Sequence, residues 1–159
     1  MLRTALLTAA AIAMISVTAA PAFAGPAETA YLQKLNASWT GRGKVVGGQG
    51  GSIACRIVFS SSGQSAKYQG RCNIPDMATQ AFNGAISYND AKGRYESRSL
   101  GGTVPGVKRG NSLVFTTKDT SMGGTAYSTM TISPASLVVD FSLIDRDGGK
   151  TSSRVTFSK

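Results

Sequence analysis

The feature that most restricts the fold of this chain is an alternation of apolar and polar side chains, which runs from Ser38 to the C-terminus. Such a two-residue period predicts β-strands with one buried and one solvated face. Clusters of Gly, Asn, Asp and Ser separate the segments, and no helical spacer of the kind that joins parallel strands lies between them. We therefore predict an all-β fold, an antiparallel up-and-down barrel of eight to ten short strands, because closure protects the strand edges.

One segment of this series is weaker than the others. The stretch from Thr103 to Lys108 contains Pro105 and Gly106. Proline cannot donate a hydrogen bond to a neighbouring strand and is therefore confined to edges and bulges of sheets. We predict an edge strand or a bulge at this place in the barrel.

A short helix is predicted ahead of the barrel, from Pro26 to Asn36. Proline suits the first turn, and the charged residues at both ends follow the helix dipole. An isolated helix of this length is marginal, so its apolar side chains need a surface to dock on. These side chains are Tyr31, Leu32 and Leu35. The chain is thus divided into a leader over 1–24, an arm with the short helix over 25–37 and a barrel over 38–159.

The first 24 residues have the three parts of a cleavable secretory signal peptide. Met1-Leu2-Arg3 is a short basic start, an uncharged stretch over 4–20 follows, and Ala22-Phe23-Ala24 supplies the small residues that a signal peptidase recognises. The uncharged stretch is shorter and more diluted with Thr, Ser and Ala than a spanning helix of about 20 apolar residues. We expect cleavage between Ala24 and Gly25, and a periplasmic or secreted protein that does not span the membrane.

The two cysteines, Cys55 and Cys72, are predicted to form a disulfide, because exported proteins meet an oxidising environment. The alternation places both on the apolar face of two consecutive strands of a hairpin. Their spacing is unlike the Cys-x-x-Cys of a redox pair. Closing this loop is worth roughly 3 kcal/mol on the chain-entropy model.

Residue usage argues against most enzyme classes. The chain contains no histidine, which excludes Ser-His-Asp and Cys-His nucleophile systems and removes the commonest zinc ligand. Its eight acidic residues show no converging pair of the kind that glycoside hydrolysis needs. We expect a protein that is not an enzyme and has no catalytic residue, no cofactor and no metal site.

The charge of the chain is concentrated on one predicted surface. Without residues 1–24 the chain keeps 16 basic residues (17 less Arg3) and 8 acidic ones, a net charge of +8. No acidic residue occurs from Thr29 through Ile74. The outward positions of the first three strands form a predicted anion-binding face: Arg42, Lys44, Arg56, Lys67 and Arg71.

Two interpretations of this face stay open. It binds an anionic envelope polymer, a lipid surface or an acidic partner, or it is a solvated face that protects the sheet from aggregation. No aromatic platform is interleaved with the cations, so a nucleic-acid partner is not expected.

The predicted barrel interior is rich in aromatic side chains. A barrel of about eight strands is either filled by side chains or holds one small ligand. Both hypotheses stay open here, a packed core and a cavity for an apolar ligand. The inward aromatic residues are Trp39, Tyr68, Phe82, Tyr88, Tyr95, Phe115, Phe141 and Phe157.

Three short motifs carry a family resemblance. They are Trp39-Thr40-Gly41-Arg42-Gly43, Cys55-Arg56 together with Gly70-Arg71-Cys72, and Val155-Thr156-Phe157. In these motifs the chain resembles small exported lipocalin-like (calycin-type) β-barrel proteins of alphaproteobacteria. The resemblance implies a periplasmic barrel module, not an enzyme, that binds a small ligand or an anionic envelope component.

The layout is also similar to that of small periplasmic inhibitors of secreted metalloproteases. The shared features are a signal peptide, a short N-terminal arm, Trp39 at the opening of the first strand and a disulfide across an early hairpin. In that family the arm enters the protease cleft, which implies this role for Gly25 to Tyr31. We therefore expect a ligand- or envelope-binding module, with a protease inhibitor as the alternative.

Overall fold

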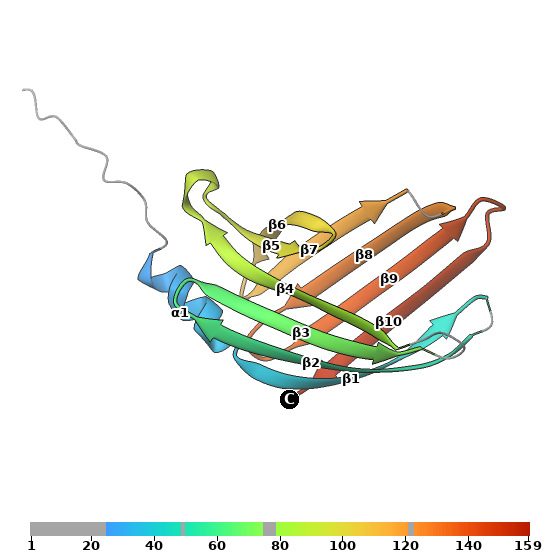
Figure 1. The fold of residues 1–159 in the computed structure, drawn as a ribbon, viewed down its shortest axis with the longest axis horizontal. Coiled ribbons are helices and arrows are strands. Elements are labelled where there is room, and N and C mark those ends of the chain that lie inside the picture. The colour runs from blue at the N-terminus through green and yellow to red at the C-terminus, as the bar shows by residue number, and fades with distance from the viewer. Residues whose placement is uncertain (1–24, 49, 75–78, 121–122) are drawn as a thin grey trace, which may run out of the picture.

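The computed structural model describes residues 25–48, 50–74, 79–120 and 123–159, and within them the chain forms a short helix followed by ten strands (Figure 1). The helix is α1 (Pro26–Lys34), and a single 3-10 turn, η1 (Asp90–Lys92), joins the fourth strand to the fifth. The strands are β1 (Ala37–Val46), β2 (Gly51–Ser62), β3 (Ser65–Asn73), β4 (Gln80–Asn89), β5 (Arg94–Ser99), β6 (Gly102–Arg109), β7 (Ser112–Asp119), β8 (Gly124–Ile132), β9 (Leu137–Asp145) and β10 (Lys150–Ser158).

Each strand pairs antiparallel with its neighbours in the sequence, and β10 pairs with β1 to close the barrel. The predicted all-β class, the up-and-down barrel and the preceding helix are confirmed, with ten strands. The helix ends at Lys34, two residues before the predicted end at Asn36. Alternating burial follows the predicted faces, as in β2, where Ile57 is buried and Arg56 beside it is exposed.

The prediction of an edge strand or a bulge at Thr103 to Lys108 is wrong for the strand as a whole, although the part that contains Pro105 is paired on one side only. In the structure β6 pairs with β5 on one side and with β7 on the other, each in a continuous register. Proline is tolerated because the pairing with β7 begins only at Gly106, so Pro105 has a partner on the β5 side alone. The barrel as a whole is closed, but within β6 only Gly106 is paired on both sides, and residues 102–105 keep a side towards β7 that is free among the described residues.

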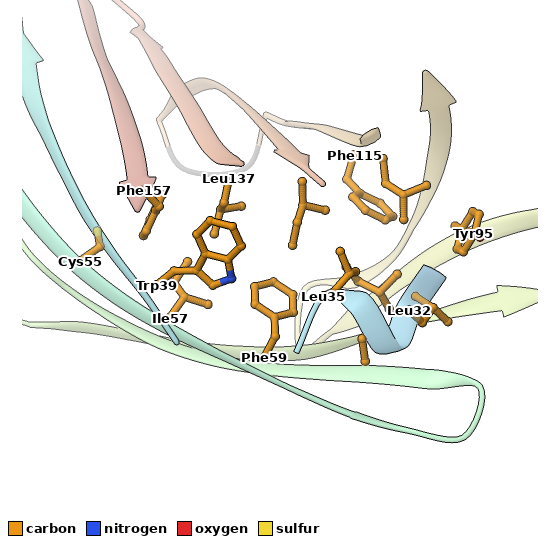
Figure 2. Packing of buried hydrophobic residues seen from close by; sticks show 14 of the residues in the cluster. Leu32, Leu35, Trp39, Cys55, Ile57, Phe59, Tyr95, Phe115, Leu137 and Phe157 are labelled. Atoms are coloured by element: carbon orange, nitrogen blue, oxygen red, sulfur yellow. The ribbon is translucent and has the colours of Figure 1, made fainter. Parts of the chain in front are cut away.

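One end of the barrel is densely packed, and we call it the packed end. Helix α1 covers this end, and its three apolar side chains lie among large side chains of the inner face (Figure 2). Trp39, at the start of β1, is completely buried there. The side chains labelled around it in Figure 2 include Leu32, Leu35, Ile57, Phe59, Phe115, Leu137 and Phe157.

Hydrogen bonds fix the helix to the barrel. The hydroxyl of Tyr31 donates to the carbonyl oxygens of Asn111 and Ile132, at 2.9 and 3.3 Å. The hydroxyl of Ser61 donates to the carbonyl oxygen of Leu32 at 2.7 Å, near the C-terminal end of the helix. The docking surface predicted for this short helix is therefore the packed end of the barrel.

Candidate ligand-binding cavity

A cavity of about 480 Å³ extends from the opposite end of the barrel, which we call the open end, to the packed end, where Ile57, Phe59, Phe115 and Phe157 also line it. The β1–β2, β5–β6 and β9–β10 connections lie at the open end, because the antiparallel strands return from the end that α1 covers. The volume of the cavity lies within the range of small-molecule sites. Its apolar lining consists of Val45, Ile53, Cys55, Ile57, Phe59, Cys72, Ile74, Phe82, Val104, Phe115, Met130, Val139, Phe141, Val155 and Phe157.

Of the eight aromatic residues predicted to face inwards, five line the cavity and three do not. Tyr68, Phe82, Phe115, Phe141 and Phe157 line the cavity. Trp39 lies in the packed end, and the ring of Tyr95 packs against those of Tyr31 and Tyr88 at centroid distances of 5.8 and 5.0 Å. The interior is therefore neither simply filled nor simply hollow.

Glycines on the inner face make room for the aromatic rings of neighbouring strands. Gly41 is paired with Phe157 in the register of β1 and β10, and a Cβ atom added to it would meet the phenyl ring at 2.5 Å. Gly70 and Phe82 form the same kind of pair between β3 and β4. A glycine that lies under an aromatic ring lets the sheet curve without a clash. The glycines at inward positions of the first strands thus shape the cavity wall.

The polar groups of the cavity are hydroxyls, and no charged side chain lines it among the described residues. The hydroxyl groups of Tyr68 and Ser97 lie 3.1 Å apart and are hydrogen-bonded. The other hydroxyl-bearing lining residues are Ser99, Thr117, Ser128, Thr151, Ser152 and Ser153. An isolated charge would be poorly solvated in these surroundings, so the cavity suits a neutral, mainly apolar molecule.

The predicted disulfide between Cys55 and Cys72 is present and lies in the cavity wall. The two residues are directly opposite in the register of β2 and β3, with their Cα atoms 4.1 Å apart. The pairing joins consecutive strands as the alternation predicted. Its position at the open end gives the wall a covalent link where the packing is less dense.

The five cations of the predicted anion-binding face all lie on exposed outward positions of β1, β2 and β3. Arg56 is directly opposite Arg71 in the register of β2 and β3. Closure of the barrel adds Arg154 of β10, which lies opposite Lys44 of β1. The structure therefore brings the predicted residues to one surface and enlarges that surface with a strand from the other end of the chain.

An outer groove of about 790 Å³ runs over β1, β10, β9 and β8 on this surface. Arg42, Lys44 and Arg154 line it together with Val46 and Tyr127. Phe141, Ser152 and Ser153 line both the groove and the cavity. The two sites are therefore separated only by the wall that β9 and β10 form.

One buried carboxylate with three cations around it, which we call the carboxylate cluster, lies on the outer wall and was not predicted. Glu96 of β5 is 1% exposed and lies 3.2 to 3.4 Å from the side-chain nitrogen atoms of Lys92, Arg94 and Arg98. The hydrogen bond from Asn89, followed by those from the three cations, lowers the pKa of Glu96 from 4.5 to about 2, although burial opposes this shift. The sequence signal was a single acidic residue with basic residues at the adjacent outward positions.

The N-terminal predictions fall at the boundary of the described residues. Ala24 and the rest of the predicted leader lie outside them, whereas Gly25 precedes α1 as its N-cap. The segment from Gly25 to Tyr31, which the inhibitor resemblance singles out, consists of this N-cap and the first part of the helix.

No group of three His, Cys, Asp or Glu side chains that could hold a metal ion occurs in the described part of the chain. None of the helices in that part is long and apolar enough to cross a membrane.

Comparison with known proteins supports the fold alone. No protein-family model matches the chain, and no curated protein matches it. Among solved structures, the chain is similar to Rv2717c from M. tuberculosis, with a TM-score of 0.52 and 13% sequence identity. The match covers 85% of this chain and 99% of that one. This similarity shows a common barrel fold and carries no function across.

Proposed function

We propose that the protein is a non-enzymatic binding module that holds a neutral, mainly apolar small molecule in the open end of its barrel. The observation that carries this proposal is the cavity of about 480 Å³ with an apolar, uncharged lining. Apolar pockets with a few polar groups are the usual form of small-molecule sites. The hydroxyl groups of Tyr68 and Ser97 would orient a ligand that carries one hydrogen-bonding group.

The lipocalin-like resemblance belongs to this proposal, since lipocalins also use the interior of an antiparallel barrel to hold one ligand. We also propose that the protein is exported. A signal peptide over 1–24 would leave Gly25 at the N-terminus, directly before α1, and an oxidising compartment would favour the Cys55–Cys72 disulfide. Cell fractionation and the measured mass of the purified protein would test the location and the cleavage site.

Binding of phenylnaphthylamine, a neutral apolar dye that brightens in apolar surroundings, tests the cavity. Titration of the purified protein should give saturable binding with one site per chain. Val139→Trp fills the cavity from β9 and should weaken dye binding by at least about tenfold, a loss of about 1.4 kcal/mol.

The matched control is Val138→Trp, because Val138 is the preceding residue of the same strand and faces outwards. It should change dye affinity by no more than about twofold, as surface substitutions usually do. Circular dichroism would establish that both variants are folded, and Val139→Phe and Val138→Phe replace them if either is not. Equal dye binding in the folded pair would refute a cavity site.

A further inference from the structure

Charge divides the closed barrel into two halves. Five consecutive strands of the barrel, β10 and β1 to β4, contain no Asp or Glu, and we call their outer surface the basic sector. The strands β5 to β9 contain five basic and four acidic residues, so their charges nearly balance. The cations of the basic sector, all exposed, are Arg42, Lys44, Arg56, Lys67, Arg71, Lys150 and Arg154.

The basic sector places like charges directly opposite each other. Arg56 faces Arg71 across β2 and β3, and Lys44 faces Arg154 across β1 and β10. Like charges at opposed positions destabilise a sheet. Arg154 has an ion pair with Asp140 at 3.5 Å, whereas neither Arg56 nor Arg71 has an ion pair within the described residues. The fold alone gives no reason for these pairs, while an external anion would neutralise them.

Exposed apolar side chains lie beside three cations of the basic sector, Arg42, Lys44 and Arg154, towards the open end. Val46, the last residue of β1, is 67% exposed, and Phe141 and Ile144 of β9 are also exposed. Val46 and Phe141 line the outer groove together with Arg42, Lys44 and Arg154. Cations and apolar groups therefore share one surface next to the mouth of the cavity.

We propose that the basic sector and these apolar side chains dock the protein on an anionic lipid bilayer. Lys and Arg side chains are attracted to anionic head groups, and apolar side chains enter the boundary between head groups and acyl chains. An anionic polysaccharide would satisfy the cations, but it would offer no apolar phase to Val46 and Ile144. This inference rests on the proposed function for its purpose, because a bilayer dissolves neutral apolar molecules and would supply the cavity with its ligand.

Sedimentation with vesicles tests the docking without any cavity ligand. The probes are vesicles of phosphatidylcholine alone and vesicles of phosphatidylcholine mixed with phosphatidylglycerol. The protein is the exported form, and its measured mass establishes the N-terminal residue. Binding should require phosphatidylglycerol and should weaken with added salt, since salt screens exposed charges. Arg56→Gln with Arg71→Gln should weaken binding by about 30-fold, because each basic residue near such a surface contributes about fivefold and the two contributions multiply.

The matched control is Arg109→Gln with Lys118→Gln, which removes two exposed cations from β6 and β7 and gives the same net charge. This control should keep most of the vesicle binding. The basic-sector variant should unfold at the same temperature as the wild type or at a higher one, because a like-charge pair has been removed. Equal weakening in the two variants would show a dependence on net charge alone and would overturn the proposal.

The apolar contribution is tested with Val46→Ser and Ile144→Ser together, which should weaken vesicle binding by roughly tenfold. Unchanged vesicle binding would show that these apolar side chains do not enter the bilayer. Tight binding to dextran sulfate with none to vesicles would show that the partner is an anionic polymer. Either result would contradict the inference. Val139→Trp distinguishes the two proposals, because it should weaken dye binding and leave vesicle binding intact. Loss of docking with dye binding preserved would leave the cavity function standing.

Discussion

The two ends of the barrel differ in what their inner faces carry. On β10 the inward series passes from Phe157 and Val155, which are buried, to Ser153, which lies nearer the open end, and all three line the cavity. On β5 the inward series passes from Tyr95 to Ser97 and then to Ser99, which is exposed. The same strands thus supply large apolar side chains at one end and small hydroxyl-bearing ones at the other.

This difference separates stability from binding within one closed sheet. The packed end buries Trp39, Leu35 and Leu32 completely, and burial of large apolar side chains is the main favourable term in folding. The open end leaves a volume unfilled, which lowers the stabilising contacts there but gives space for a ligand. Helix α1 contributes to this separation by filling one end only.

The largest expected effect comes from truncation at the packed end. Trp39→Ala should lower the free energy of unfolding by about 3–5 kcal/mol, because it removes a fully buried ring and leaves a cavity. Val139→Ala, in the cavity wall, should cost only about 1–2 kcal/mol, because its side chain already borders open space. Urea unfolding followed by circular dichroism measures both losses. Tryptophan fluorescence cannot be used for Trp39→Ala, since Trp39 is the only tryptophan. Equal losses would contradict the division into a packed and an open end.

Removal of the disulfide should have the next largest effect. Cys55→Ala with Cys72→Ala should lower the free energy of unfolding by about 3 kcal/mol, because a loop of 17 positions is no longer closed in the unfolded chain. Thermal unfolding measures the loss. A reductant should lower the stability of the wild type by a similar amount and leave the double variant unchanged. A reductant effect on the double variant would show that another property of the protein is being measured.

The barrel could be predicted from sequence because its alternation depends only on which side of each strand faces inwards. Ile57 and Arg56 on β2 illustrate this, since adjacent residues of a strand lie on opposite faces. The rule for proline held at Pro105 itself, which has a free side towards β7 among the described residues, but it could not show that β6 belongs to a closed barrel. The β7 ladder begins one residue later, at Gly106, and the barrel closes through it.

The cavity could not be predicted because alternation gives the face of a residue and not its height along the barrel. Tyr95 and Phe141 both face inwards, but register places one under α1 and the other at the open end. The basic sector was only partly predicted for the same kind of reason. Arg154 lies far from Lys44 in sequence and meets it only when β10 closes against β1.

The carboxylate cluster on β5 should give a smaller effect, because the cations around Glu96 are between 43% and 63% exposed and solvent screens them. Since the pKa of Glu96 is about 2 in the folded protein and 4.5 ordinarily, its contribution is complete above about pH 4.5 and is lost as the pH falls towards 2. Glu96→Gln should therefore flatten the loss of thermal stability over this acid range. Asp147→Asn, in the exposed β9–β10 turn, is the control. An identical acid profile in Glu96→Gln and the wild type would refute the role of the cluster.

The smallest expected difference separates two buried tyrosines of the packed end. The hydroxyl of Tyr31 donates to two barrel carbonyl oxygens, whereas the hydroxyl of Tyr95 has no hydrogen-bond partner within the described residues. Tyr31→Phe should lower the free energy of unfolding by about 1 kcal/mol, because a hydrogen bond that holds α1 is lost. Tyr95→Phe should be neutral or slightly stabilising, because it removes a buried polar atom without a partner.

Alkaline titration gives a second test of the two buried tyrosines, Tyr31 and Tyr95. Burial raises the pKa of both Tyr31 and Tyr95 from 10.0 to about 12, so the folded state favours the neutral phenol. Their contribution is then complete below about pH 10 and is lost as the pH rises towards 12. Each single Phe variant should lose part of this alkaline destabilisation, measured by urea unfolding at successive pH values. If Tyr95→Phe instead costs as much as Tyr31→Phe at neutral pH, the hydroxyl of Tyr95 is bonded in solution, and the packed end is more polar than its hydrogen bonds indicate.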